Sequence, residues 1–135
     1  MLLKEIFNKT PKSLELHLDD IVASAQNVYD EWDEDVDVYA GGGICHLIAD
    51  AICDYLYEQN FECSTVSQSI GEVHVYTVVK IPEGVYCIDI PPSTYESGGG
   101  YSWEKIPNVE FDKHDLIIDM IDPDPNTFED YIDSY

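Results

Sequence analysis

The first part of the chain holds two stretches in which apolar residues recur at steps of three and four. This spacing predicts two amphipathic helices, each with one side facing a core. The first should begin at Thr10 and Pro11, a capping residue followed by a proline at the first helical position, and should stop near Trp32. The second should begin near Ile44, after the glycine run 41–43. The apolar positions are Leu14, Leu18, Ile21, Val22, Ala25, Val28, Tyr29 and Trp32 in the first stretch, and Leu47, Ile48, Ala51, Ile52, Tyr55 and Leu56 in the second.

From residue 61 onward the pattern favours short strands. Apolar and polar residues alternate over 72–80, which predicts a half-buried strand flanked by strands at 61–70 and 85–90. The segment 81–84 is typical of a hairpin turn, and Pro91-Pro92 ends the returning strand. A polar, glycine-rich loop is expected over 93–102, residues 111–121 fit either a helix or a strand, and a short helix is expected after Thr127. Together these elements predict a single domain over residues 1–135 of the α+β class, with N-terminal helices packed on a small antiparallel sheet of three to five strands.

The composition supports a folded protein without crosslinks. At 135 residues and 44% hydrophobic content, the chain can bury a sizeable core. It has no apolar run long enough to span a membrane and no apolar leader at its N-terminus, so a cytoplasmic location with no membrane contact is expected. Its four cysteines form no CxxC pair, which argues against both a zinc site and a disulfide framework, and most of the thiols are expected to be buried and inert.

The net charge of −22 is the unusual total, with 28 acidic residues and six basic ones, all of them lysine. Such a charge repels nucleic acid, and without arginine the chain lacks the planar group that usually grips phosphate, so direct nucleic-acid binding is not expected. A strongly acidic surface favours cationic substrates or basic partner proteins. It also suits a non-enzymatic acidic binding protein, such as a decoy that mimics DNA or a catalytically inactive relative of an enzyme, and this alternative stays open.

Cys45 is the strongest candidate for chemistry. It follows a glycine run, which lets the chain turn sharply and lets a substrate backbone approach, and it opens the second predicted helix. In the first turn of a helix, the dipole and the unpaired N–H groups stabilise a thiolate and can later stabilise an oxyanion. A buried structural cysteine at a helix start is the alternative interpretation.

A nucleophilic thiol needs a base, and the base needs a third group to fix its orientation. His74 lies on the middle predicted strand and Asp89 on the next one. The two side chains share a face of the hairpin only if its turn has two or four residues. A histidine held in the core and an aspartate that shapes a turn are the simpler explanations.

In the order Gly43-Ile44-Cys45-His46-Leu47-Ile48-Ala49-Asp50-Ala51-Ile52, then Glu72-Val73-His74-Val75-Tyr76, then Tyr86-Cys87-Ile88-Asp89, the chain resembles the transglutaminase core of the papain-like superfamily. The resemblance spans about 50 residues and rests on few identities. It implies Cys45 as nucleophile, His74 as general base and then acid, and Asp89 as the orienting group. It also implies a hydrolase or acyl transferase of the protease, amidase or transglutaminase type that acts on a peptide or protein amide and needs no cofactor.

The remaining parts of the site are less well defined by the sequence. The aromatic residue that often follows the histidine is displaced to Tyr76, and Gln26, Asn27 and Gln68 are the candidates for an oxyanion-hole side chain. The substrate-binding candidates are Gly43, Tyr76, Gly99, Tyr101 and Trp103. No metal is expected. His46 with Asp50 offers too few ligands, and the series Asp122, Asp124, Asn126, Asp130 and Asp133 departs from a calcium-binding loop.

Overall fold

The computed structural model describes residues 10–32, 44–70, 72–99 and 102–133, without the side chains of 68–70, 72–73, 98–99 and 102–103. The helices are α2 (Lys12–Glu15), α3 (Leu18–Glu31), α4 (Cys45–Glu58) and α5 (Phe128–Asp133), with short 3₁₀ turns η1 (Pro92–Thr94), η2 (Lys113–Asp115) and η3 (Pro125–Thr127). The strands are β1 (Glu62–Ile70), β2 (Glu72–Ile81), β3 (Gly84–Asp89), β4 (Glu96–Gly99), β5 (Ser102–Lys105) and β6 (Ile117–Asp122).

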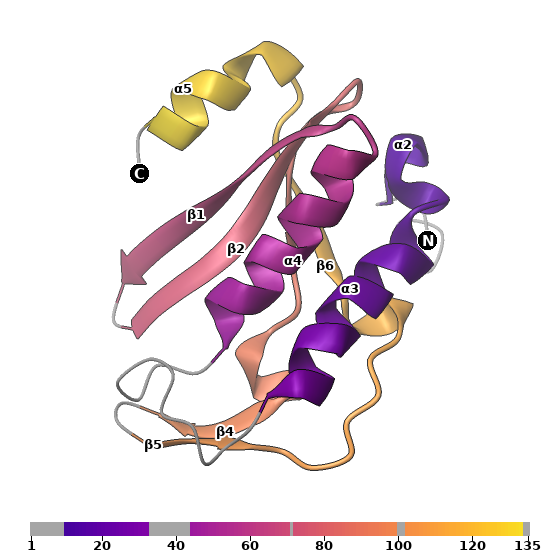
Figure 1. Ribbon diagram of the computed structural model, residues 1–135. Helices are drawn as coiled ribbons and strands as arrows, with labels where there is room; N and C mark the ends of the chain where they lie inside the picture. The colour runs from indigo at the N-terminus through magenta and orange to yellow at the C-terminus, as the bar shows by residue number, and fades with distance from the viewer. Residues whose placement is uncertain (1–9, 33–43, 71, 100–101, 134–135) are drawn as a thin grey trace, which may run out of the picture.

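Four strands form an antiparallel sheet in the order β1-β2-β3-β6, and β4 pairs with β5 in a separate antiparallel ribbon. Figure 1 shows α4 lying along this sheet with α3 beside it. The α+β class predicted from the sequence is therefore confirmed. None of the helices in these described ranges has the length and apolar content that crossing a membrane requires.

Both faces of the sheet are covered at the middle of β2. Val79 and Ile81 of β2 belong to the main core with α3 and α4, whereas Tyr76 and Val78 pack with Phe128 of α5 on the other face. Because successive side chains of a strand point to opposite faces, residues 76–79 are all buried. The prediction of a half-buried strand was wrong here, since it took no account of a helix on the second face.

The first predicted helix is divided into two pieces. α2 ends before Leu16, which is 92% exposed, and α3 begins at Leu18. The capping position is Pro11 and not Thr10. Contacts far along the chain hold the first piece, because the backbone N–H and the hydroxyl of Ser13 both donate to the carboxylate of Glu83, at 2.9 and 2.6 Å. The predicted end near Trp32 is confirmed, since Trp32 is the C-terminal cap of α3.

The hairpin of β2 and β3 turns through Pro82 and Glu83, which gives the two-residue loop that the sequence allowed. Gly84 follows with φ +146°, and a Cβ atom at this position would lie 2.3 Å from the backbone oxygen of Asp122. Only glycine fits such a conformation and such a close approach without strain. The turn therefore fixes the register of the strands that carry His74 and Asp89.

The segment after Pro91-Pro92 is more ordered than a loop. It forms η1 and then the hairpin of β4 and β5, so the prediction of an irregular loop over 93–102 was wrong in its described part. The ambiguous stretch 111–121 forms η2 and then most of β6, and the predicted last helix is confirmed as α5. η3 precedes α5, and Asp124, whose side chain accepts from the N–H of Asn126, caps this turn.

Candidate active site

His74 and Asp89 are joined by a short hydrogen bond. The Nε2 atom of His74 lies 2.7 Å from Oδ2 of Asp89. The ladder between β2 and β3 ends at the pair Thr77↔Ile88. Continuing the register by one residue sets Asp89 opposite Tyr76 and diagonally across from His74, within reach on the same face. The two-residue turn thus meets the geometric condition for the pair.

Cys45 meets the imidazole from the helix. It is the first residue of α4, it is buried, and its thiol is a hydrogen-bonding partner of His74. Since Asp89 engages Nε2, Nδ1 is the ring nitrogen left for the sulfur. The capping residue is Ile44, whose apolar side chain cannot accept a hydrogen bond from the first turn. The N–H groups of the first turn therefore receive no side-chain cap, and Cys45 stands in this turn, where the helix dipole favours negative charge.

The pKa of His74 is raised to about 10, first by the hydrogen bond to Asp89 and then by the hydrogen bond to Cys45, while burial opposes the shift. Coulomb interactions with Asp89 and with Cys45 raise it further. His74 is consequently an imidazolium at neutral pH. Its side chain keeps 31% of its surface exposed, so the ring remains in contact with solvent.

Cys45, His74 and Asp89 come together beyond the point where the backbone pairing of β2 with β3 ends. By alternation, His74 and Asp89 belong to the sheet face that carries Tyr76. α4 packs on the other face, where the hydroxyl of Thr77 donates to the carbonyl of Ala49 at 2.8 Å. The thiol and the imidazole meet past the last backbone pair of β2 with β3, where the ladder no longer separates the two faces.

Tyr76 packs its ring against the imidazole of His74. Its ring stacks on His74 with centroids 6.1 Å apart and an interplanar angle of 26°. Its hydroxyl lies 2.7 Å from that of Tyr131 in α5. The ring is only 8% exposed, so its contacts are with protein groups more than with solvent. The structure thus places this predicted substrate-binding residue in the packing around His74.

Tyr95 and Glu96 are site neighbours that the sequence did not indicate. Both are buried, and the pKa of Tyr95 is raised by burial first and then by the charges of Glu96, Cys45 and Asp89. The Tyr95 hydroxyl has no hydrogen-bond partner among the residues described. No pattern marks a tyrosine in a polar, glycine-rich segment as a core residue. Tyr95, between η1 and β4, is instead buried in the main core, where its ring meets Phe111 edge to face.

The other predicted substrate-binding residues can be placed only in part. Gly43 and Tyr101 lie outside the described residues. Gly99 pairs with Ser102 in the β4–β5 ribbon. Trp103 pairs with Gly98, and its side chain is outside the described part.

The three candidates for an oxyanion-hole side chain have different positions. Gln26 is held by structural bonds, since its amide donates to Val109 and Asp30 and its carbonyl accepts from the N–H of Phe111. Asn27 is exposed on α3. Gln68 is the cross-strand partner of His74, but its side chain is outside the described part.

The structure also bears on the possible metal ligands and on the burial of the four cysteines. Within the described ranges, no cluster of three or more His, Cys, Asp or Glu residues is arranged to hold a metal. The carboxylates of Asp122 and Asp124 instead accept backbone N–H groups two residues further on. Of the four thiols only Cys45 is buried and the others are half-buried, so the prediction that most are buried was wrong.

Comparison of the chain with known protein families, curated proteins and solved structures gave no match.

Proposed function

We propose that the protein is a papain-like cysteine hydrolase or acyl transferase that acts on an amide through a Cys45 thioester. The observation that carries the proposal is the arrangement around one imidazole: Asp89 on Nε2 at 2.7 Å and the Cys45 thiol as the second hydrogen-bonding partner. A nucleophile, a base and an orienting group in this order are what thiol-based acyl transfer requires. The position of the sulfur at the start of α4 supports the same function.

The first half-reaction follows from these positions. The Cys45 thiolate attacks the amide carbonyl carbon, and the new oxyanion faces the N–H groups at the start of α4. His74 then gives its proton to the amide nitrogen, the C–N bond breaks and the amine leaves. The acyl group remains on Cys45 as a thioester, and His74 is neutral.

The second half-reaction restores the site. Neutral His74 takes a proton from water or from a second amine, whose oxygen or nitrogen attacks the thioester carbonyl. The C–S bond breaks, a carboxylic acid or a new amide is released, and the thiolate–imidazolium pair forms again. Asp89 holds the ring orientation through both steps, because it keeps Nε2 engaged.

The charge of the chain indicates the kind of substrate. With 28 acidic residues against six lysines, the protein attracts cationic groups, so the proposed substrate is a peptide or protein amide of basic character. Cationic substrates also gain in association rate at low ionic strength. Salt therefore should raise KM for basic peptides more than for neutral ones.

The test is the pH dependence of alkylation at each cysteine, followed by mass spectrometry, in the wild type and in His74→Ala. Cys45 should react rapidly below pH 7 in the wild type and should lose at least about tenfold of this rate in His74→Ala. His114→Ala, which removes an exposed histidine of η2, is the matched control and should leave the rate unchanged. Cys87, whose pKa is raised chiefly by burial, is the internal reference thiol.

If Cys45 reacts no faster than Cys87 at any pH and is indifferent to His74→Ala, the enzyme proposal fails. The non-enzymatic acidic binding protein would then take its place. If the pair is present, libraries of basic peptide amides, with and without an added amine, distinguish hydrolysis from acyl transfer by the mass of the product.

A further inference from the structure

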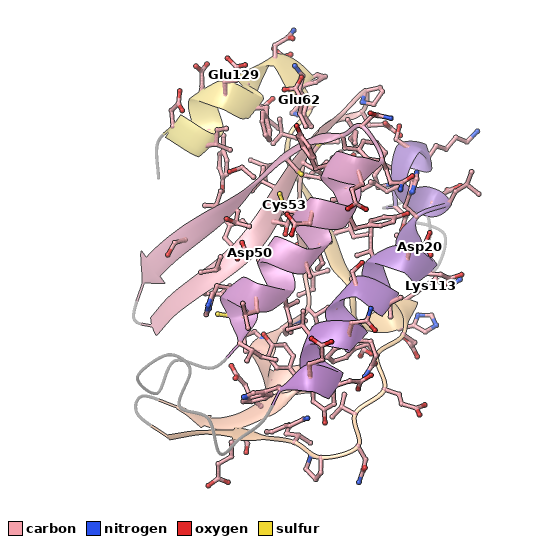
Figure 2. The ribbon with its side chains drawn as sticks, in the orientation of Figure 1. Asp20, Asp50, Cys53, Glu62, Lys113 and Glu129 are labelled. Carbon is pink, nitrogen blue, oxygen red and sulfur yellow. The ribbon has the colours of Figure 1, made fainter. Side chains whose placement is uncertain are left out.

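A second pair of thiols lies well away from the site. Sγ of Cys53 in α4 is 3.0 Å from Sγ of Cys63 in β1, and Sγ of Cys63 is also 3.1 Å from the carbonyl oxygen of Cys53. Both cysteines are unbonded and half-buried. Figure 2 shows Cys53 on α4 one turn beyond Asp50, with Glu62, the residue before Cys63, near the far end of the same helix. Cys45 is eight residues before Cys53, about 12 Å along the helix axis.

The fold brings the two cysteines together by reversing the chain directly after α4. The helix ends at Glu58, Asn60 adopts a positive φ of 71°, and β1 starts at Glu62 and runs back beside the helix. Cys53 and Cys63 therefore face each other across a tight connection. The sequence shows them only as two separated thiols, which is why no pairing was expected from it.

We propose that Cys53 and Cys63 form a reversible disulfide modification site, closed by exchange with a low-molecular-weight disulfide. A disulfide has an S–S length of about 2.05 Å, so the 3.0 Å contact needs about 1 Å of approach. The site is independent of the proposed acyl-transfer function, because neither sulfur touches Cys45, His74 or Asp89 in the contacts described above.

The surroundings assign different roles to the two sulfurs. Cys63 lines an open pocket of about 450 Å³ with Tyr57, Asn60, Phe61, Glu62 and Phe128, and so a small disulfide can reach it. The hydrogen bond from Cys53 lowers the pKa of Cys63, against the effect of burial. The hydrogen bond to Cys63, burial and the nearby carboxylates of Asp54 and Asp50 raise the pKa of Cys53. Since Cys63 lines this pocket and Cys53 does not, Cys63 is the sulfur that a small disulfide reaches first, and Cys53 is the resolving thiol.

The exchange balances in two steps. The Cys63 thiolate attacks one sulfur of the small disulfide, which forms a mixed disulfide and releases one small thiolate. Cys53 then loses its proton to solvent and attacks Sγ of Cys63, which forms the protein disulfide and releases the second small thiolate. The small disulfide is the oxidant and is reduced to two thiols. Excess small thiol reverses both steps.

The experiment uses the full chain, reduced and desalted, then incubated with glutathione disulfide and quenched with iodoacetamide. The peptide masses should show loss of two hydrogens at Cys53 and Cys63 with no glutathione retained on either. Glutathione on Cys45, the proposed nucleophile, is counted separately, and Cys87 should remain available to iodoacetamide. Because the chain has six lysines and no arginine, a protease that cuts at acidic residues is the suitable choice to map the linked peptides. The linkage should join Cys53 to Cys63.

Matched variants separate the roles. In Cys53→Ser, glutathione should accumulate on Cys63, since the resolving thiol is missing. In Cys63→Ser, Cys53 should react with glutathione disulfide at least about tenfold more slowly than Cys63 does in Cys53→Ser. Cys87→Ser, which removes a half-buried thiol on β3, should form the same bridge at the wild-type rate.

A physical readout accompanies the chemical one. Closing the short loop 53–63 restricts the unfolded chain, so the oxidised wild type should melt roughly 5–10 °C above the reduced form, and Cys53→Ser should show no such shift. The proposal is overturned if Cys63 of the wild type retains glutathione without a bridge to Cys53, or if the bridge involves Cys45 or Cys87. The wild-type result decides the matter even where a variant fails to fold.

Discussion

His74 and Asp89 lie on the two arms of a single hairpin, with Nε2 and Oδ2 2.7 Å apart and only a two-residue turn between the strands. The pair therefore owes its geometry to one local element. Cys45 joins it from a different element, α4. The predictions below treat the pair and the helix separately for this reason.

Asp89→Asn should lower the pKa of His74. The carboxylate contributes both a hydrogen bond and a negative charge, and an amide keeps the size of the side chain without the charge. The pKa should fall from about 10 toward the ordinary value of 6.5, by more than about one unit, when the ring is titrated by NMR. Asp119→Asn, an exposed change on β6, should leave it in place. An unchanged pKa in Asp89→Asn would show that Asp89 does not hold the imidazolium.

The contribution of His74 to stability should be lost in alkaline solution. Its pKa is about 10 in the folded protein, above the ordinary value of 6.5, so the folded state binds the proton more tightly than the unfolded state. This contribution is fully present below about pH 6.5 and is lost as the pH rises through 10. Urea unfolding of the wild type and His74→Gln at pH 6, 8 and 10 should show their difference shrinking as the pH increases. A difference that is constant over this range contradicts the assignment.

Thr77→Val should loosen the docking of α4 on the sheet. The buried hydroxyl of Thr77 donates to the carbonyl of Ala49 at 2.8 Å, and valine keeps the shape while it removes the donor. The free energy of unfolding should fall by about 1 kcal/mol. Thr65→Val, at the half-buried position directly opposite on β1, is the control and should change stability by less than about 0.5 kcal/mol. Equal effects at both positions would mean that the bond to α4 is not the cause.

Gly84→Ala should be severely destabilising. The φ of +146° is unfavourable for alanine, and its Cβ would lie 2.3 Å from a backbone oxygen that cannot move without shifting β6. A loss of about 3 kcal/mol or more is expected by urea unfolding, with a lower thermal midpoint. A loss below about 1 kcal/mol would show that the turn and β6 rearrange easily, and that Gly84 does not fix the register of the site.

Much of the fold could be read from the sequence because local patterns determine it. The stripe from Ile21 to Tyr29, the start of α4 after Ile44 and the hairpin turn all depend on spacing or on a single glycine. What could not be read depends on contacts between distant segments. The break at Leu16 and the second cover on β2 both involve residues fifty or more positions away.

The candidate site shows the same division. Residue types and their order suggested Cys45, His74 and Asp89, and the structure brings these three together. Tyr95 has no local signal, since its burial depends on the fold of a segment that reads as a loop. The contact of Cys53 with Cys63 depends on the direction in which the chain leaves α4, which no spacing rule states.

The tight turn between β2 and β3 also bears on how the site assembles during folding. A hairpin of this length closes on the order of microseconds, because the segments that it joins are neighbours in the chain. The acid–base pair can thus form within the hairpin, whereas the nucleophile reaches it only once α4 has settled on the sheet. The reactivity of Cys45 therefore reports when α4 docks on the sheet, the last step in assembling the site. The time course of its alkylation during refolding would record when the helix arrives.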